Sequence, residues 1–208
     1  YEWLTDSNRA YPVTIDPTVT MHNGIHDGYT YSYEPYGDNI YGFEDQLKVG
    51  KSAWMSECDY FETYIKFDNL PEFPENYHLL SSSIMITPKK SCGTWEEFIV
   101  GAYEITEDWQ NVYTTALDSC LTYNNRPSAS TVATSHAYFN FDFAGCPEAI
   151  DVTELTKAWY SGEKANNGVK LSMVNETNNA WDSMIYHSSR NAKNAQWCLK
   201  KAPNLLKE

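Results

Sequence analysis

The chain has 208 residues and a formal net charge of −13, from 15 Lys and Arg against 28 Asp and Glu. A protein that binds nucleic acid through its phosphates needs clustered positive charge, so this balance excludes that class. Hydrophobic residues make up 42% of the chain, which is enough for a packed core and too much for a disordered protein. No apolar run is long enough to span a membrane.

The N-terminal stretch differs from the rest of the chain. Residues 1–20 contain Pro12 and Pro17 around one alternating stretch, which predicts an N-terminal linker or an edge strand. The length and the pattern that follow predict a single domain over residues 21–208.

Short runs of alternating apolar and polar residues recur along this domain. They lie at residues 64–68, 138–143 and 169–173, and more continuously apolar runs lie at 84–87 and 98–105. Clusters of Gly, Pro and Asn separate these runs. Short strands at regular spacing, joined by polar turns, predict an all-β sandwich or barrel.

One segment shows helical periodicity. Leu155, Ala158 and Trp159 form a single apolar stripe, and Gly162 provides a C-terminal stop. Asp151 precedes Glu154 by three residues, the spacing of a capping box. The sequence therefore predicts one short helix near residues 152–161.

Five cysteines are widely spaced, at positions 58, 92, 120, 146 and 198, and no C-x-x-C occurs. A zinc ribbon or a thioredoxin-like motif is thus unsupported. The number allows at most two disulfides with one thiol left over. Buried free thiols and partial pairing both remain open.

Catalytic motifs are absent from the sequence. It contains no nucleophile elbow, phosphate-binding loop or zinc-protease signature. The adjacent carboxylates Glu96-Glu97 and Glu107-Asp108 are typical of a solvated face in an acidic protein. A pair of carboxylates for glycoside hydrolysis cannot be selected from spacing alone.

Metal sites have weak support. His22 and His26 are four residues apart, but the surrounding glycines favour a loop and ordinary surface histidines. Calcium prefers carboxylate and amide oxygens, which residues 34–39 and Glu44-Asp45 could supply. We expect that no cofactor is required, with structural Ca²⁺ as an option that the acidic composition leaves open.

The chain is rich in aromatic residues, with 16 Tyr and 7 Trp. Tyr and Trp fill β-sandwich cores, and they also stack on the apolar faces of sugar rings. Trp109 and Trp159 lie beside apolar residues and are predicted to be core. A second group stands in polar, loop-like contexts or in the alternating run that begins at Tyr29. The ligand-binding candidates from this group are Trp54, Trp95, Trp181, Tyr31 and Tyr36, and Tyr29 and Tyr33 belong to the same run.

Six motifs lie in order along the chain, at residues 11–19, 47–50, 64–71, 103–109, 121–127 and 151–171. Together these motifs resemble the DNRLRE-type domains of bacterial secreted, wall-associated and RHS-like proteins. They include Trp109, Trp159 and Leu121-Thr122-Tyr123-Asn124-Asn125-Arg126-Pro127, in which Tyr123 replaces the family's Trp. The hexapeptide that names the family is absent. The matching residues Trp109, Tyr123, Asn124 and Trp159 are interpreted as scaffold.

The resemblance implies a jelly-roll β-sandwich of two antiparallel sheets, acting as a non-catalytic carbohydrate-binding or cell-surface accessory module. We expect a secreted or cell-surface bacterial protein whose parent carries other modules. The partner is expected to be a polysaccharide, neutral rather than polyanionic because of the negative charge, and neither nucleic acid nor membrane. Two alternatives remain: a structural or adhesion spacer without a glycan ligand and, with less support, a polysaccharide lyase or glycoside hydrolase.

Overall fold

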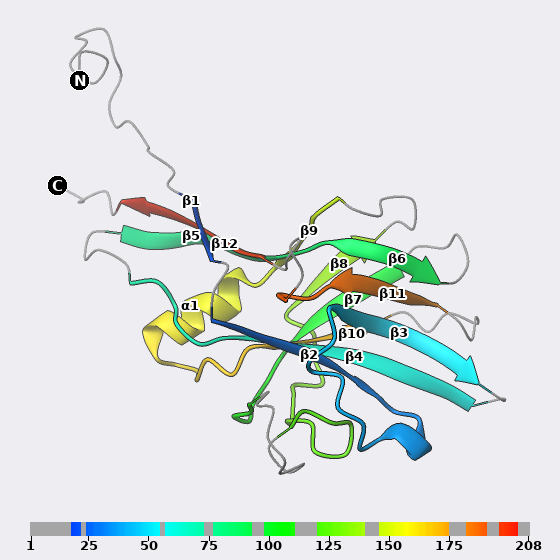
Figure 1. Ribbon diagram of the computed structural model, residues 1–208. Helices are drawn as coiled ribbons and strands as arrows, with labels where there is room; N and C mark the ends of the chain where they lie inside the picture. Colours follow the sequence, from blue (N-terminus) through cyan, green and yellow to red (C-terminus); the bar gives the residue numbers. More distant parts are fainter. Residues whose placement is uncertain are drawn as a thin grey trace, which may run out of the picture.

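The computed structural model describes residues 18–21, 24–54, 57–72, 77–92, 98–110, 120–139, 146–174, 182–190 and 196–203. Within these ranges the chain forms two antiparallel sheets and one α-helix (Figure 1). The predicted all-β sandwich with one short helix is therefore confirmed. None of the helices in these ranges has the length and hydropathy needed to cross a membrane.

The smaller sheet has the strand order β1-β12-β5-β9. Its strands are β1 (Thr18–Met21), β12 (Gln196–Pro203), β5 (Tyr77–Ile86) and β9 (Glu148–Asp151). Strand β1 lies at the edge of this sheet and pairs only with β12 among the described strands. Most of the predicted N-terminal linker lies outside the described residues.

The larger sheet has the order β6-β11-β3-β4-β10-β7-β8, and β2 also pairs with β4. Its strands are β2 (Ile25–Tyr31), β3 (Gln46–Trp54), β4 (Glu57–Phe67), β6 (Pro88–Cys92), β7 (Phe98–Glu104), β8 (Ser135–Phe139), β10 (Val169–Met173) and β11 (Ser183–His187). A single 3₁₀ turn, η2 (Glu34–Tyr36), follows β2. In Figure 1, η2 and the helix lie at opposite ends of the molecule.

Strand β4 pairs with three other strands. Strand β2 runs along one edge of it, from Phe61 to Phe67. The other edge pairs first with β3, at residues 57–61, and then with β10, at residues 63–65. Two branches of the larger sheet therefore diverge from β4.

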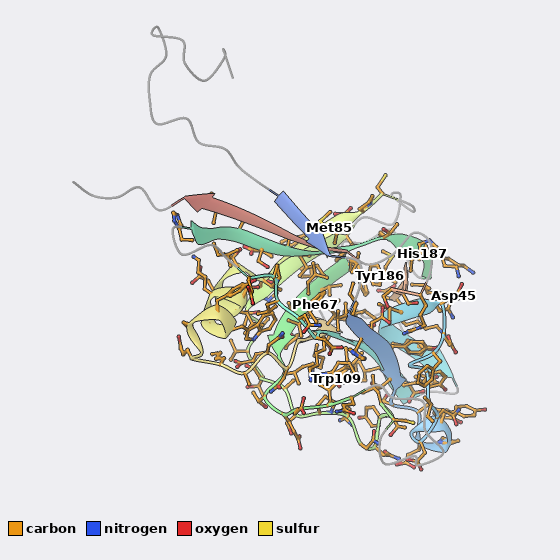
Figure 2. All side chains as sticks on the ribbon, turned by 60° about the vertical axis from the view of Figure 1, so that its left-hand side comes forward. Asp45, Phe67, Met85, Trp109, Tyr186 and His187 are labelled. Carbon is orange, nitrogen blue, oxygen red and sulfur yellow. The ribbon has the colours of Figure 1, made fainter. Side chains whose placement is uncertain are left out.

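The main core fills the space between the two sheets. Ile65 and Phe67 on β4 face inward, and Tyr186 on β11 is completely buried among the same residues (Figure 2). Ile84 and Ile86 of β5 close the core from the smaller sheet. Each such side chain contributes about 1.5–3 kcal/mol relative to its exposed state. The alternation at residues 169–173 reflects this burial, since Val169 and Leu171 belong to the same core.

A second apolar cluster lies on the opposite face of β4. It consists of Tyr64, Ile105, Trp109 and Leu121. The indole Nε1–H of Trp109 donates a 2.8 Å hydrogen bond to the carbonyl of Asn167. The prediction that Trp109 and Trp159 are core residues is confirmed, since each is 7% exposed.

Helix α1 (Thr153–Ser161) packs near β5 and buries Leu155 and Trp159. The predicted capping box is wrong, because Val152 and not Asp151 occupies the N-cap. The Asp151 carboxylate instead accepts hydrogen bonds from the backbone N–H and the hydroxyl of Thr153, at 2.8 and 2.6 Å. The predicted stop at Gly162 is confirmed by its left-handed φ of 73°.

Cysteine pairing is only partly described. Cys120 is buried, and Cys146 is an exposed free thiol. The placement of the other three side chains lies outside the described part of the chain, so both pairing hypotheses remain predictions.

Two glycines with positive φ provide a test of the backbone packing. A Cβ at Gly168 (φ 84°) would lie 2.1 Å from the carbonyl oxygen of Ile65, whereas one at Gly162 (φ 73°) would meet nothing within 4 Å. We expect Gly162→Ala to cost about 1 kcal/mol, from the left-handed conformation alone. Gly168→Ala should cost about 3 kcal/mol or more, because β10 must also shift from β4. Urea unfolding measures both, and equal losses would contradict the assigned close contact.

Candidate functional site

An aromatic groove lies where the inner face of β4 extends beyond the core. Strands β2 and β4 are in register, so that Tyr31 faces Phe61 and Ile25 faces Phe67. Alternation places Phe61 on the same face as Ile65 and Phe67, which belong to the core. The sheet face that forms the core at one end of β4 thus carries aromatic rings at the other end.

Most rings of this groove lie in two stacks of nearly parallel rings, which meet edge to face between Tyr29 and Phe61. Tyr31 stacks on Phe61 with ring centroids 4.4 Å apart, and Tyr29 stacks on Tyr41 at 4.7 Å. Tyr36, from η2, lies 6.4 Å from Tyr31 with an angle of 13° between the ring planes. The three pairs form a layered aromatic surface of the kind that apolar ring faces stack on.

Two adjoining cavities open onto these rings. The tyrosine groove, as we call the site, is lined by Tyr29, Tyr31, Tyr33, Tyr36, Asn39, Tyr41, Lys48, Ser52 and Phe61. One cavity of about 200 Å³ lies on the side of Asn39 and Lys48, and one of about 280 Å³ lies on the side of Tyr33 and Ser52. Tyr31 and Tyr36 line both cavities.

The sequence candidates divide into two groups. Tyr31 and Tyr36 are brought together in the groove, and Tyr36 is 46% exposed. Tyr29, which belongs to the same run but is not one of the candidates, is 1% exposed and forms the floor of the groove. The side chains of Trp54, Trp95 and Trp181 lie outside the described residues, so their role in binding remains a prediction.

Other groove residues had no clear signal in the sequence. Phe61 joins the site through the pairing of β2 with β4, which a one-dimensional pattern does not specify. Lys48 comes from β3, with its ammonium group 4.8 Å from the Tyr29 ring centroid and 5.3 Å from that of Phe61. Only Tyr41 stood in the same Tyr-rich stretch as the candidates.

The loop that carries Tyr36 is held at its first end by Asn124. The Asn124 side-chain amide donates a 2.8 Å hydrogen bond to the Asp38 carboxylate, and its backbone N–H donates to the carbonyl of Gly37 at 3.2 Å. A Cβ on Gly37 would lie 2.9 Å from the Asn124 amide nitrogen. Asn124 was interpreted as scaffold from its turn motif, and the turn also contacts the groove loop.

The second end of the loop is held at Glu44 and Asp45. The backbone N–H of Ser188 donates to the Asp45 carbonyl at 3.2 Å, and Arg190 Nε donates to the Glu44 carbonyl at 3.0 Å. Figure 2 shows Asp45 near His187, at the end of β11. The Glu44 carboxylate accepts a 2.9 Å hydrogen bond from the Tyr29 hydroxyl, which fixes the floor of the groove.

Burial raises the pKa of two titratable groups beneath the groove. Burial, together with the nearby Glu44 carboxylate, raises the pKa of Tyr29 far above its usual range. Burial also raises the pKa of Asp27, and the Arg190 guanidinium opposes this effect from 2.7 Å. Asp27 is completely buried and also accepts a 2.5 Å hydrogen bond from the backbone N–H of Ser189.

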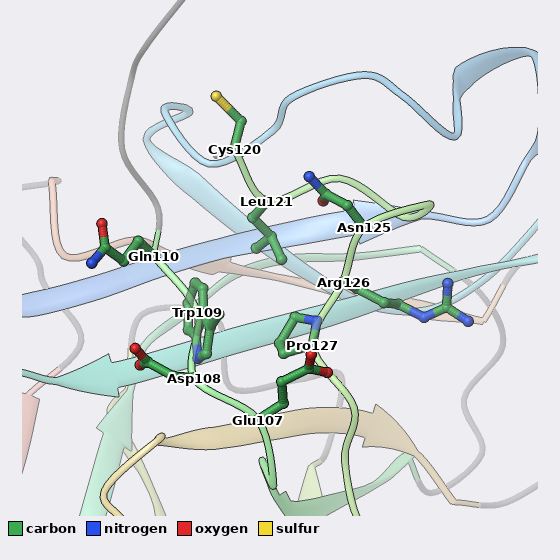
Figure 3. Close-up of a pocket in the computed structure, with 9 residues that line it drawn as sticks. All are labelled: Glu107, Asp108, Trp109, Gln110, Cys120, Leu121, Asn125, Arg126 and Pro127. Atoms are coloured by element: carbon green, nitrogen blue, oxygen red, sulfur yellow. The ribbon is translucent and has the colours of Figure 1, made fainter. Parts of the chain in front are cut away.

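A further cavity of about 530 Å³ lies on the opposite face of β4. Figure 3 shows Trp109 and Leu121 in its middle, with Arg126 extending to one side. Its charged groups already have partners: the Lys66 ammonium lies 2.5 Å from the Asp108 carboxylate, and Arg126 lies 3.7 Å above the Tyr123 ring. This cavity offers fewer free aromatic faces than the tyrosine groove.

The carboxylates considered for catalysis have structural partners. The Lys66 ammonium lowers the pKa of Asp108, which keeps this group ionised rather than poised as a general acid. The Glu107 carboxylate accepts a 3.1 Å hydrogen bond from the backbone N–H of Ser128. Glu96-Glu97 lies outside the described residues.

The described residues contain no set of side chains arranged as calcium ligands. Within the described ranges, no group of three or more His, Cys, Asp or Glu side chains is arranged to hold a metal ion. His26 lies 2.5 Å from the Asp68 carboxylate, and His22 is outside the described residues. The Asp38 and Glu44 carboxylates form the loop contacts described above.

Exchanging the two side chains of the Asp38–Asn124 hydrogen bond tests the contact at the first end of the loop. Asn124→Asp sets two carboxylates against each other and should raise hydrogen-exchange rates at the Gly37 and Asn39 amides about fivefold, for a loss of about 1 kcal/mol. The double variant Asn124→Asp/Asp38→Asn restores a donor and an acceptor and should return these rates to the original values. Continued fast exchange in the double variant would show that the contact does not hold the loop.

Removal of Arg190 tests the buried charge beneath the groove. Arg190→Ala leaves Asp27 without its cation and should cost about 3 kcal/mol at neutral pH. Because the folded-state pKa of Asp27 is raised above 3.8, its penalty is present above that pKa and is relieved as the pH falls through it. The stability deficit, measured by urea unfolding, should therefore shrink as the pH falls from 7 toward the raised pKa of Asp27.

The matched control removes the titrating group. Arg190→Ala/Asp27→Asn has no carboxylate at this position, so its stability deficit should not depend on pH over the same interval. If the stability deficit of Arg190→Ala instead grew as the pH fell, the pH effect could not be assigned to Asp27.

Comparison with known proteins connects this fold to a family. The model of carbohydrate-binding module family 96 matches residues 20–201. The tRNA nuclease WapA of Bacillus subtilis (strain 168) is 25% identical over 201 residues, which is 92% of this chain and 8% of that protein. The tRNA3(Ser)-specific nuclease WapA of Bacillus spizizenii is 25% identical over 202 residues, with the same coverage.

The chain thus spans only a small part of the length of these relatives. The resemblance to a carbohydrate-binding-module-like domain is confirmed, whereas the DNRLRE-type label rests on the sequence motifs alone. Because the family model covers most of the sequence, this protein belongs to carbohydrate-binding module family 96.

Proposed function

We propose that this domain is a non-catalytic module that binds polysaccharide in the tyrosine groove. The observation that carries the proposal is the set of nearly parallel rings of Tyr31, Tyr36 and Phe61, open to solvent at Tyr36. Sugar rings present apolar C–H faces that stack on such rings, while their hydroxyls need polar partners at the rim. Asn39 and Ser52 stand at the edges of the two cavities and supply those groups.

A neutral glycan suits the charge of the protein better than a polyanion. The chain carries a net charge of −13, which repels a polyanionic ligand at long range. Lys48 is the cation in the tyrosine groove, and its ammonium group lies over aromatic rings. We therefore assign the groove to neutral polysaccharide and place the domain in a larger secreted or cell-surface bacterial protein.

The nuclease activity in the names of the WapA relatives is not assigned to this domain. The match covers 8% of those proteins, and the domain's acidic character opposes binding to a phosphate backbone. We propose that the domain contributes attachment to glycan and leaves any catalysis to other parts of its parent protein.

Replacement of Tyr36 tests the groove. Tyr36→Ala removes an exposed ring from the center of the groove and should weaken polysaccharide binding about tenfold, or ~1.4 kcal/mol, with little change in stability. Tyr138, which is 61% exposed on β8, supplies the matched control, and Tyr138→Ala should bind as the original protein does. Calorimetry and affinity electrophoresis on β-glucan, xylan, mannan and a polyuronate, with and without Ca²⁺, provide the measurement.

The alternatives correspond to distinct outcomes. Absence of binding to every polysaccharide would favour the spacer or adhesion hypothesis. Release of sugar products would support a lyase or hydrolase. Equal losses in both tyrosine variants would move the binding surface away from the groove.

A further inference from the structure

The two cavities of the tyrosine groove are separated by a single pair of rings. Among the described residues, Tyr31 and Tyr36 line both cavities, whereas each of the others lines only one. Tyr31 is fixed in place by Phe61, which stacks on it at 4.4 Å. Tyr36 is fixed by the backbone of η2, since its N–H donates to the Tyr33 carbonyl at 2.8 Å and its own carbonyl accepts from Asn39. These contacts hold the two rings, which we call the Tyr31–Tyr36 divider, in place in the folded protein.

Each cavity alone is small. Their volumes of about 200 and 280 Å³ lie below the roughly 300 Å³ at which sites that enclose drug-sized ligands begin. Together they fall within that range. The size of each cavity suits one sugar residue, and the shared rings suit the linkage between two residues.

The chemistry of the two cavities differs. Asn39, Tyr41 and Lys48 give one cavity an amide, a hydroxyl and an ammonium group. The other cavity offers the hydroxyls of Tyr33 and Ser52 beside the divider. Because the two ends of the groove differ in their polar groups, the groove favours one orientation of a bound polysaccharide chain over the other.

We propose that the tyrosine groove holds two adjacent residues of one linear polysaccharide chain, one in each cavity, across the Tyr31–Tyr36 divider. This proposal rests on the proposed function of the groove. A ligand that fills one cavity holds its second residue beside the other at high effective concentration, so the second contact needs no separate encounter. The site therefore selects oligosaccharides of two or more residues over single sugars.

A ladder of ligand lengths tests the proposal. The probes are glucose and the β-1,3- and β-1,4-linked gluco- and manno-oligosaccharides from two to six residues, titrated into the full chain by calorimetry. For the linkage that binds, affinity should rise at least about tenfold from one residue to two, and change little from three to six.

Two variants assign the residues to their cavities. Tyr33 lines the 280 Å³ cavity and Asn39 lines the 200 Å³ cavity, so Tyr33→Ala and Asn39→Ala each remove a side chain from one of them. Both should weaken disaccharide binding, and only one of them should weaken monosaccharide binding. Tyr138→Ala remains the unaffected control, and thermal unfolding of each variant separates a lost contact from a lost fold.

The outcomes separate this proposal from the function on which it rests. Equal affinity for one and two residues, with binding still lost in Tyr36→Ala, would overturn the two-cavity assignment and leave the glycan-binding groove in place. The same holds if Tyr33→Ala and Asn39→Ala weaken the monosaccharide equally. A protein that binds none of the probes and none of the polysaccharides would overturn both proposals.

Discussion

Burial of both faces of β4 is the constraint on which the rest of the structure depends. Its inner face contributes Ile65 and Phe67 to the space between the sheets, and its outer face contributes Tyr64 to the cluster around Trp109. A strand covered on both sides holds its neighbours in fixed register, because a slip of one residue would exchange the two sets. Phe61 in the tyrosine groove lies on the same strand and the same face as the core residues. The packing that fixes β4 therefore also fixes this side of the groove.

Charge is distributed so that the groove stays largely uncharged in an acidic protein. The carboxylates near it are occupied: Glu44 with the Tyr29 hydroxyl, Asp38 with Asn124, and Asp27 with Arg190. The first two contacts join the loop to β2 and to the turn at Asn124, and the third joins β2 to Arg190. A negatively charged domain can in this way present a surface made mainly of aromatic rings and neutral polar groups.

The sequence predicted the fold better than the site, for physical reasons. Period-2 alternation reports which residues of a strand share a face, so the sandwich followed from it, and the core role of Trp109 followed from its apolar sequence context. The same alternation pointed to Tyr31, but it could not separate the open ring of Tyr31 from the buried ring of Tyr29, because exposure depends on the loop folded above them. The contact between Asp38 and Asn124 joins residues 86 positions apart, which no local pattern encodes.

The loop between β2 and β3 is held mostly through its main chain. The carbonyls of Gly37, Glu44 and Asp45 accept the hydrogen bonds that fix its two ends. Backbone anchors do not depend on the side chains between them, so Asn39 and Tyr41 can be replaced while the loop keeps its course. The fold thus separates the shape of the proposed binding surface from its chemical identity, and a few substitutions in this loop would change the groups offered to a proposed sugar ligand on an unchanged scaffold.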